Sequence, residues 1–240
     1  MEVKNRLLNF NAVIYQNDEW FKFSLDSVLL VNFVTINLRC KKIMEFACGN
    51  AAISMLLTYK TNADIVGIEI QKCVYDLGVK SVIDNKMDTQ IKLFNYDVKE
   101  IKKYFSGDSF DLVICNPPYF KVNKMEYLCD NVVKRNSRHE LLITLDDILK
   151  SANYILKSGG IFAMVYTTSR FIEVINTMIK YNIEPKRVQF IHSKEKNNSD
   201  IFLIEGIKNG NLGFKVLPEL VVYNNDGSYN EVVRKMYNEE

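Results

Sequence analysis

The sequence predicts an α/β fold built around a seven-stranded, mostly parallel sheet that closes with an antiparallel hairpin. Short runs rich in β-branched and aromatic residues recur along the chain, and segments with apolar residues at helical spacing separate them. The length of 240 residues suits one such unit with additions, and no Gly/Ser-rich or Pro-rich linker divides it. We therefore expect a single domain over residues 1–240, with an N-terminal cover over 1–40 and a core over 41–240.

Seven apolar runs are the expected strands. They occupy residues 43–47, 65–70, 91–95, 110–115, 161–166, 187–192 and 201–207. Helical periodicity covers residues 50–60, 71–85 and 145–157. Gly159 and Gly160 follow the last helical segment and supply a stop signal. The polar segment 193–200 has no helical pattern, so we expect the two strands on either side of it to pair antiparallel.

The first forty residues lack a strong strand pattern but contain one helix signal. Ser24 is a candidate helix cap, and Asp26 would lie in the first turn, where a negative charge is favourable. The most apolar early stretch, residues 28–38, is short and interrupted by Asn32 and Asn37. We therefore expect neither a secretory signal nor a membrane segment, and a cytoplasmic location.

Composition and charge exclude several classes of protein. Hydrophobic residues make up 48% and charged residues 25% of the chain, which is ordinary for a globular protein. The formal net charge of +2 indicates no global basic field for nucleic acid, although local patches remain open. Five cysteines are present without a C-x-x-C pair, which predicts reduced thiols and neither a disulfide framework nor a metal site: Cys40, Cys48, Cys73, Cys115 and Cys129.

A turn of small residues follows the first predicted strand. Such residues let the backbone come close to a ligand at the carboxyl edge of the sheet, where open α/β folds bind ligands. An ordinary strand-to-helix turn would look similar. The candidate cofactor-binding residues here are Glu45, Ala47, Cys48, Gly49 and Asn50.

Acidic residues end the next two strands. Glu69 lies about 20 residues beyond the small-residue turn, the spacing at which a carboxylate accepts hydrogen bonds from ribose hydroxyls. Asp97 is a candidate partner for an adenine amino group, and the alternative is a cap for the following helix. Ile70 and Val98, which follow these acids, complete the cofactor candidates. The ordered set is more specific than any member.

The first turn lacks the sequence motifs of phosphate-binding and dinucleotide-binding loops, and their absence narrows the choice of ligand. No G-x-x-x-x-G-K-[ST] phosphate loop is present in the sequence. The turn has one glycine where the dinucleotide fingerprint has three. These differences matter less for a ligand without phosphate, so the sequence favours S-adenosylmethionine as the cofactor.

The fourth strand runs directly into the candidate catalytic residues Asn116, Pro117, Pro118 and Tyr119. Consecutive prolines stiffen the loop and leave carbonyl groups as acceptors. The Asn116 side-chain oxygen and the Pro117 carbonyl can accept from a planar amino group, while Tyr119 can stack on its ring. A rigid loop that simply ends a buried strand is the alternative. The pattern predicts methylation of an amino nitrogen.

These residues resemble the class I methyltransferases with an N-P-P-Y loop and, among them, the bacterial tRNA1(Val) adenosine-37 N6-methyltransferases. The resemblance extends over nearly the whole chain. It rests on the turn at Gly49 and on residues 21–27, 116–121, 137–140, 159–160, 183–187 and 203–208. The later segments discriminate, because DNA amino-methyltransferases, guanine N2 enzymes and protein glutamine methyltransferases share the loop.

The resemblance implies a Rossmann-like methyltransferase fold and a target adenosine beside the tRNA anticodon, flipped into the pocket. It implies Glu69 on the cofactor ribose, Asp97 near the cofactor adenine, and residues 116–119 on the target base. Arg138 and His139, which follow the candidate catalytic loop, are candidate tRNA contacts, with simple surface charge as the alternative. Further basic candidates for phosphate contacts, each of which can also be simple surface charge, are Lys121, Lys124, Lys134, Arg135, Lys186, Arg187, Lys194 and Lys196.

The chain departs from the family's first motif at three positions. Ala47 and Ala51 stand where the family usually has glycine, and Glu45 stands where it usually has aspartate. If these backbone positions need positive φ, alanine strains the turn and weakens cofactor binding. Two alternatives therefore stay open: an amino-methyltransferase for DNA adenine or protein glutamine, and a non-catalytic RNA-binding module with the same fold. The sequence leaves the oligomeric state open.

Overall fold

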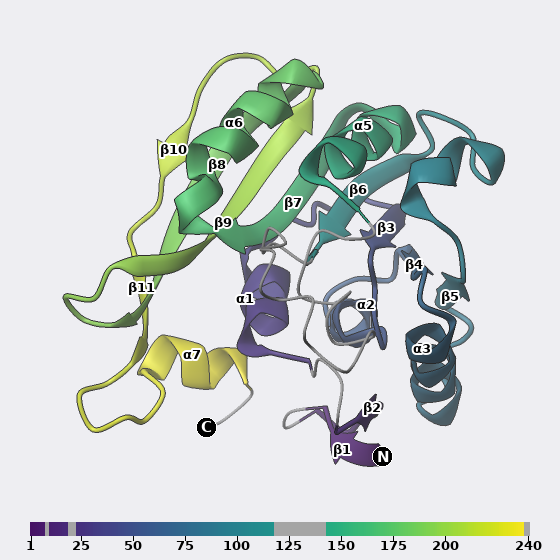
Figure 1. Cartoon of the computed structure of the whole chain (residues 1–240), viewed down its shortest axis with the longest axis horizontal. Coiled ribbons are helices and arrows are strands. Elements are labelled where there is room, and N and C mark those ends of the chain that lie inside the picture. Colours follow the sequence, from purple (N-terminus) through teal and green to yellow (C-terminus); the bar gives the residue numbers. More distant parts are fainter. Residues whose placement is uncertain (8–9, 19–22, 118–142, 238–240) are drawn as a thin grey trace, which may run out of the picture.

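A mixed β-sheet runs through the middle of the computed structural model, which describes residues 1–7, 10–18, 23–117 and 143–237 (Figure 1). Within these ranges nine strands form the sheet. They are β3 (Lys42–Phe46), β4 (Asp64–Ile68), β5 (Ile91–Phe94), β6 (Phe110–Cys115), β7 (Leu156–Thr167), β8 (Ile183–Lys194), β9 (Ser199–Lys208), β10 (Lys215–Val216) and β11 (Leu220–Tyr223). Their order is β10-β8-β9-β7-β6-β3-β4-β5, and β11 also pairs with β8.

The direction of the strands agrees with the sequence prediction. Strands β3, β4, β5, β6 and β7 pair with one another in parallel. Strand β9 lies antiparallel to both β7 and β8. Each of the seven predicted strands is therefore present, and the predicted antiparallel hairpin is β8–β9. The predicted α/β class is confirmed.

Two strands at one edge of the sheet were not predicted. Strands β10 and β11 both pair in parallel with β8, and Leu217 and Pro218 interrupt them. Leu217 N–H donates to the Val188 carbonyl at 2.8 Å, so the segment continues along the edge between the two strands. Proline lacks a backbone donor, and each strand is short. The local pattern therefore resembles a loop, and pairing with β8 makes it a sheet edge.

Helices cover both faces of the sheet (Figure 1). One face carries α1 (Leu25–Phe33), α2 (Ala52–Thr58) and α3 (Lys72–Asp84), and the other carries η1 (Val98–Lys103), α5 (Leu145–Ile155) and α6 (Phe171–Lys180). Alternate residues of β3 serve the two cores, since Ile43 packs on the α1 and α2 side and Met44 on the α5 and α6 side. Helix α7 (Glu231–Met236) packs against α1.

The predicted helix after residue 145 begins with a complete cap and ends earlier than expected. Thr144 accepts from Asp147 N–H while the Asp147 side chain accepts from Thr144 N–H, which satisfies two backbone donors of the first turn. The helix ends at Ile155 because Leu156 is already extended and opens β7. Gly159 has φ of +80° inside β7, so it marks an irregularity in the strand rather than the helix end.

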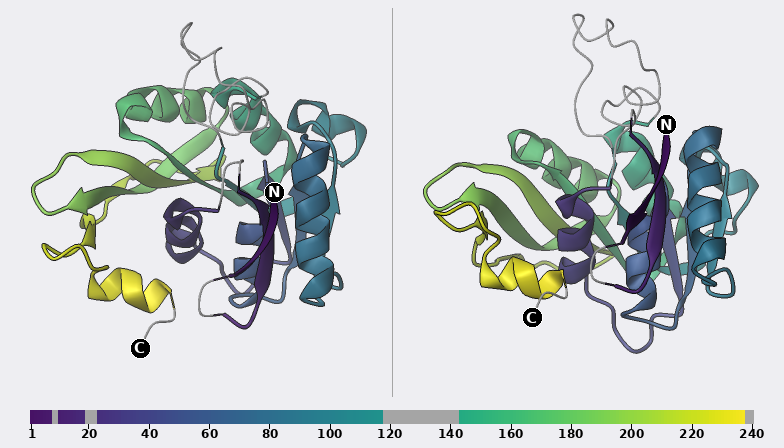
Figure 2. Two further views of the ribbon diagram at one scale, coloured as in Figure 1. Left: turned by 60° about the horizontal axis from the view of Figure 1, so that its bottom comes forward. Right: turned by 90° about the horizontal axis from the view of Figure 1, so that it is seen from below.

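The N-terminal cover contains a hairpin that was not predicted. Strands β1 (Glu2–Arg6) and β2 (Val13–Asn17) pair antiparallel and lie beside α3 (Figure 2). Tyr15 N–H donates to Ser81 Oγ and Val13 N–H donates to Asn85 Oδ1, each at 2.9 Å. A two-stranded hairpin on its own is only marginally stable. Side chains at the C-terminal end of α3 stabilise this one, so the hairpin depends on residues that are distant in sequence.

Helix α1 follows the predicted position, but its cap differs from the prediction. Ser24 occupies the N-cap position with extended backbone, yet its side chain accepts no hydrogen bond from the helix. Ser24 Oγ is buried and has no partner among the described residues. Asp26 lies in the first turn as expected.

Candidate functional site

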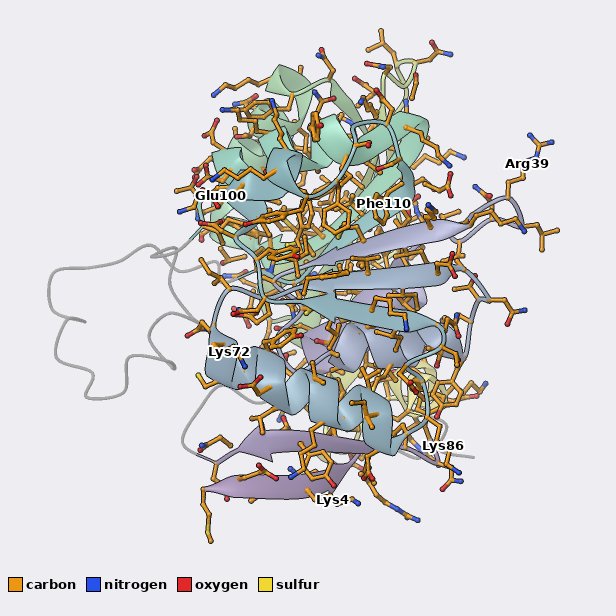
Figure 3. All side chains as sticks on the ribbon, turned by 90° about the vertical axis from the view of Figure 1, so that its right-hand side faces the viewer. Lys4, Arg39, Lys72, Lys86, Glu100 and Phe110 are labelled. Atoms are coloured by element: carbon orange, nitrogen blue, oxygen red, sulfur yellow. The ribbon has the colours of Figure 1, made fainter. Side chains whose placement is uncertain are left out.

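The predicted cofactor residues meet at the carboxyl edge of β3, β4, β5 and β6. Neighbouring strands end at matched positions, because Phe46 pairs with Ile68 on one side and with Cys115 on the other. The residues after each strand therefore emerge side by side. In Figure 3, Lys72 at the start of α3 lies at this edge, and Arg39, which precedes β3, lies at the opposite one.

The turn after β3 has left-handed backbone at three positions. The φ angles are +51° at Ala47, +56° at Gly49 and +67° at Ala51. Cys48 N–H donates to the Ile68 carbonyl at 2.9 Å, which ties the turn to the tip of β4. A Cβ at Gly49 would meet no atom of the described residues within 4 Å, so these residues leave space beside this backbone. The condition considered from the sequence, that the two alanines stand at positive-φ positions, therefore holds in the structure.

The Glu69 carboxylate lies against this turn and is 5% exposed. Its Oε2 accepts from Gly49 N–H at 3.1 Å, and its Oε1 accepts from Gln71 N–H at 2.8 Å. Burial raises the pKa of Glu69, while these backbone hydrogen bonds act in the opposite direction. The acid predicted for ribose binding and the small-residue turn are thus in direct contact.

Glu45 faces the helix after the turn. Ser54 in α2 donates to Glu45 Oε2 from its backbone N–H at 2.9 Å and also from its hydroxyl. Burial raises the pKa of Glu45 to about 8. The described contacts of Glu45 thus hold α2 to β3. A cofactor contact of Glu45 stays a prediction.

The tips of β4 and β5 are joined by a residue that the sequence reasoning missed. Asn95 Nδ2 donates to the Glu69 carbonyl at 2.7 Å and to the Ile70 carbonyl at 3.0 Å. An amide directly after a buried strand was the available signal. Ile70 is half-exposed at this edge and Val98 is buried.

Asp97 has the arrangement expected of a helix cap. Its Oδ1 accepts from Lys99 N–H at 2.9 Å, at the start of η1. Its Oδ2 lies 3.4 Å from Lys99 Nζ. These contacts match the capping alternative, and adenine recognition by Asp97 stays a prediction.

Two glycines keep the site compact, and neither was singled out from the sequence. A Cβ at Gly67 in β4 would approach Leu93 Cδ2 to 2.6 Å and Cys48 Sγ to 2.9 Å. A Cβ at Gly78 in α3 would lie 3.1 Å from the Gly49 carbonyl oxygen. Glycine inside a strand or helix pattern was the signal, because it marks close approach of another segment.

Asn50, the last residue of the predicted cofactor turn before Ala51, links the site to the N-terminal cover. Its Nδ2 donates to the Tyr15 carbonyl of β2 at 3.3 Å. The hairpin and the turn therefore support each other, although 35 positions separate the two residues in the chain.

The catalytic candidates are described only in part. Asn116 follows β6 and is half-buried, and Pro117 beside it is buried. Asn116 Nδ2 donates to Ser27 Oγ of α1 at 3.2 Å, a contact that no sequence spacing indicates. Residues 118–142 lie outside the described residues, so the structure places none of the candidates Pro118, Tyr119, Lys121, Arg138 and His139.

Two of the basic candidates for tRNA contacts have structural partners. Arg187 Nη2 donates to Glu205 Oε2 at 2.8 Å and to Thr35 Oγ1 at 2.7 Å, and its guanidinium lies 4.4 Å from the Phe33 ring centroid. Lys186 Nζ donates to the Asn211 carbonyl. Arg187 therefore joins α1 to the β8–β9 hairpin, in contrast to the phosphate contact considered from the sequence.

The described ranges show neither a metal-ligand cluster nor a membrane-spanning helix. These ranges contain no group of three or more His, Cys, Asp or Glu side chains arranged to hold a metal ion. They also contain no helix with the length and apolar character needed to cross a membrane.

A cavity of about 500 Å³ lies away from the candidate site. Its lining includes Lys42 and Asp64, which begin β3 and β4, so it opens at the amino edge of the sheet. None of the predicted cofactor or catalytic residues lines it.

Comparison with known families adds independent information. The sequence model of the family described as Eco57I restriction-modification methylase matches residues 37–202, which is more than half of the chain. The chain belongs to this methylase family. The matched range begins before β3 and ends within β9, so it contains the whole candidate site of this methylase.

Two curated relatives align with a longer part of this methylase than the family model does. A protein of Photobacterium profundum, named tRNA1(Val) (adenine(37)-N6)-methyltransferase, is 23% identical over 185 residues, which are 76% of this chain and 75% of the relative. A protein of the same name from Bacteroides thetaiotaomicron is 24% identical over 220 residues, or 90% of each chain. These relatives confirm the resemblance on which the sequence interpretation relied.

Solved structures confirm the methyltransferase fold of this methylase. A predicted O-methyltransferase from Agrobacterium tumefaciens superposes with a TM-score of 0.71 at 18% identity, covering 89% of this chain and 96% of that one. TYW2 of P. horikoshii superposes with a TM-score of 0.59 at 12% identity, covering 87% and 72%.

Proposed function

We propose that this methylase transfers a methyl group from S-adenosylmethionine to N6 of adenosine-37 beside the anticodon of tRNA. The observation that carries the proposal is the position of Asn116, which leaves β6 at the same sheet edge as the Ala47–Ala51 turn and Glu69. An amide with acceptor capacity thus stands next to a ligand-binding turn.

The residues at this edge fit the cofactor. The described residues leave space beside the Gly49 backbone, and the turn lies directly on a buried carboxylate and lacks the phosphate-binding loops of nucleotide enzymes. Glu69 would accept hydrogen bonds from the ribose hydroxyls, and the backbone from Ala47 to Asn50 would line the amino-acid end. Ile70, Asp97 and Val98 would surround the adenine.

The reaction requires orientation more than proton abstraction. The cofactor supplies a methyl group on a sulfonium, which is already activated toward nucleophiles. The exocyclic nitrogen of adenine is a poor nucleophile because its lone pair is delocalised into the ring. Asn116 Oδ1 and the Pro117 carbonyl would accept its two N–H bonds and direct the lone pair to the methyl carbon. Tyr119 would stack on the flipped base.

The choice of tRNA as substrate is supported by the names of the curated relatives, which match over most of the chain. A base in a single-stranded anticodon loop is cheap to unstack, and loops of RNA are the usual targets of sequence-specific recognition. Lys121, Arg138 and His139 are the proposed tRNA contacts. A tRNA enzyme of this kind works in the cytoplasm.

The deciding experiment is mass spectrometry of nucleosides after incubation with S-adenosylmethionine and tRNA from cells that lack the enzyme. We expect new N6-methyladenosine with the wild-type protein, none with Asn116→Ala, and undiminished product with Asn5→Ala, an exposed asparagine of β1 that serves as matched control. No methylated base despite cofactor binding would reject the tRNA substrate.

The description of the matched family as a restriction-modification methylase makes DNA adenine the second candidate substrate. The same assay with unmethylated DNA separates the two. N6-methyldeoxyadenosine in DNA without product in tRNA would replace the tRNA proposal with the DNA one.

A further inference from the structure

Helix α1 contacts Asn116, the residue after β6, from its first turn, and contacts the β8–β9 hairpin at its other end. At its first turn, Ser27 Oγ accepts from Asn116 Nδ2 at 3.2 Å, although the two residues are 89 positions apart in the chain. Ser27 is 6% exposed, so water does not readily replace this contact. One end of the amide is therefore held, and no described residue donates to the other end, Asn116 Oδ1.

We propose that Ser27 is a positioning residue that fixes the orientation of the Asn116 amide for catalysis. This inference rests on the proposed function, because it assigns Asn116 Oδ1 to the amino group of the substrate. Ser27 touches neither the substrate nor the cofactor in this scheme. It acts only through Asn116.

The physical reason lies in the shape of the asparagine side chain. Its oxygen and nitrogen are nearly the same size, and rotation about χ2 exchanges them in a broad energy surface. A flipped amide would direct its own N–H bonds at the N–H bonds of the substrate and repel them. The Ser27 hydroxyl can accept from Nδ2 or donate to an oxygen, so it restrains rotation of the amide about χ2, and the N–H bonds of the substrate favour the orientation in which Oδ1 faces them.

The hydroxyl can serve as a reference point because α1 is anchored at its other end. Thr35 N–H, just beyond the helix, donates to Glu205 Oε2 at 2.9 Å, and Arg187 pairs with the same oxygen at 2.8 Å. Glu205 is buried in β9. Asn32 Oδ1 near the end of α1 accepts from Lys60 Nζ at 2.8 Å. Strand β9 and the segment after α2 therefore hold the C-terminal part of α1.

The same anchor gives a role to two sequence segments that the site does not use. Arg187 belongs to segment 183–187 and Glu205 to segment 203–208, both of which mark the family resemblance. Their side chains meet at the C-terminal end of α1. These segments thus hold the helix that carries Ser27.

Two variants test the proposal kinetically. Ser27→Ala should lower kcat for tRNA methylation by roughly ten- to a hundredfold, as expected when a reacting group loses its orientation, while calorimetry gives the same Kd for S-adenosylmethionine within about twofold. Thr177→Val is the matched control, because Thr177 is a buried residue of α6 whose hydroxyl donates to the Glu173 carbonyl of the same helix, away from the candidate site. It should keep kcat even where it lowers the melting temperature. An unchanged kcat in Ser27→Ala, or an equal loss of cofactor affinity, would overturn the proposal.

A second readout does not depend on activity. The side-chain amide resonance of Asn116 is identified by its absence from the ¹⁵N spectrum of Asn116→Ala. In Ser27→Ala this resonance should shift and its amide protons should exchange faster with solvent, whereas Thr177→Val should leave it in place. A resonance that does not move in Ser27→Ala would refute the contact. Failure of the wild-type protein to methylate tRNA would instead refute the proposed function, so the two failures are distinguishable.

Discussion

Ala47 and Ala51 have backbone conformations that L-residues with a side chain seldom adopt. The left-handed conformation is less favourable than the right-handed one by roughly 1–2 kcal/mol for such residues. Two hydrogen bonds hold the turn in this conformation. Cys48 N–H donates to the Ile68 carbonyl, and Gly49 N–H donates to the Glu69 carboxylate. The strain therefore lies in the segment that is proposed to bind the cofactor.

Ala47→Gly should relieve part of this strain. We expect a gain of about 0.5–1 kcal/mol in the free energy of unfolding and tighter binding of S-adenosylmethionine, because glycine adopts positive φ freely. Denaturant unfolding and calorimetry measure the two effects. Ala63→Gly is the control, since Ala63 does not have positive φ, and it should destabilise the protein. Equal losses in both variants would contradict the strain argument.

The buried Glu45 predicts a pH dependence of stability. Its folded pKa of about 8 lies above the ordinary value of 4.5, so the folded state binds the proton more tightly than the unfolded state does. The tighter proton binding at Glu45 stabilises the folded state fully at pH values below the unfolded pKa. This stabilisation is lost as pH rises through the folded pKa. Unfolding curves from pH 5 to pH 8 should show the wild type losing stability relative to Glu45→Gln, by on the order of 1 kcal/mol per pH unit. A constant difference between the two proteins would show that the pKa is not raised.

At the scale of secondary-structure elements, α1 depends on an ion pair that is only partly exposed. The side chain of Glu205 is 6% exposed and that of Arg187 is 26% exposed. Glu205 also receives the Thr35 N–H, and Arg187 also bonds the Phe33 carbonyl. Removing one partner leaves a buried charge unpaired, which is much more harmful than removing both.

Arg187→Met should therefore lower the free energy of unfolding by about 3 kcal/mol, since it leaves Glu205 buried and unpaired. The double variant Arg187→Met with Glu205→Gln should recover part of the loss. Denaturant unfolding of the two single variants and the double variant forms the required cycle. If Arg187 instead served as a phosphate contact, its loss would change the salt dependence of tRNA binding and leave stability nearly unchanged.

At the scale of the whole molecule, the carboxyl edge of the sheet, where the cofactor is proposed to bind, brings together four separate segments of the chain. The turn after β3, the tips of β4 and β5, and Asn116 after β6 converge there, and Asn50 links them to the N-terminal hairpin. A ligand bound at this edge stabilises the folded state by mass action, because the unfolded chain does not assemble the edge.

S-adenosylmethionine at a hundred times its Kd should thus stabilise the protein by about 2.7 kcal/mol. For a protein of this size the melting temperature should rise by roughly 5–10 °C in differential scanning calorimetry. NAD at the same concentration should produce no comparable rise, because the turn lacks the glycines of the dinucleotide fingerprint. Absence of a shift with S-adenosylmethionine, even with tRNA present, would favour the non-catalytic RNA-binding alternative.

The sequence by itself determined the features that depend on local pattern. The seven principal strands, the helices α1, α2, α3 and α5 and the antiparallel hairpin follow from runs and periodicity, and the family was indicated by the resemblance of short motifs. The same holds for the meeting of Glu69 with the Gly49 turn, because parallel strands bring their carboxyl ends to one edge. The sequence raised positive φ at Ala47 only as a condition, and the structure supplied the angle.

Only the tertiary structure decided the contacts between segments distant in the chain. The pairing of β10 and β11 with β8, the docking of the hairpin on α3, and the partners of Arg187 and Asn116 have no local signature. Arginine looks the same in sequence whether it binds a phosphate or a buried carboxylate, and serine looks the same on any face of a helix. Burial and the nearest partner decide such roles, and both arise only when the chain is packed.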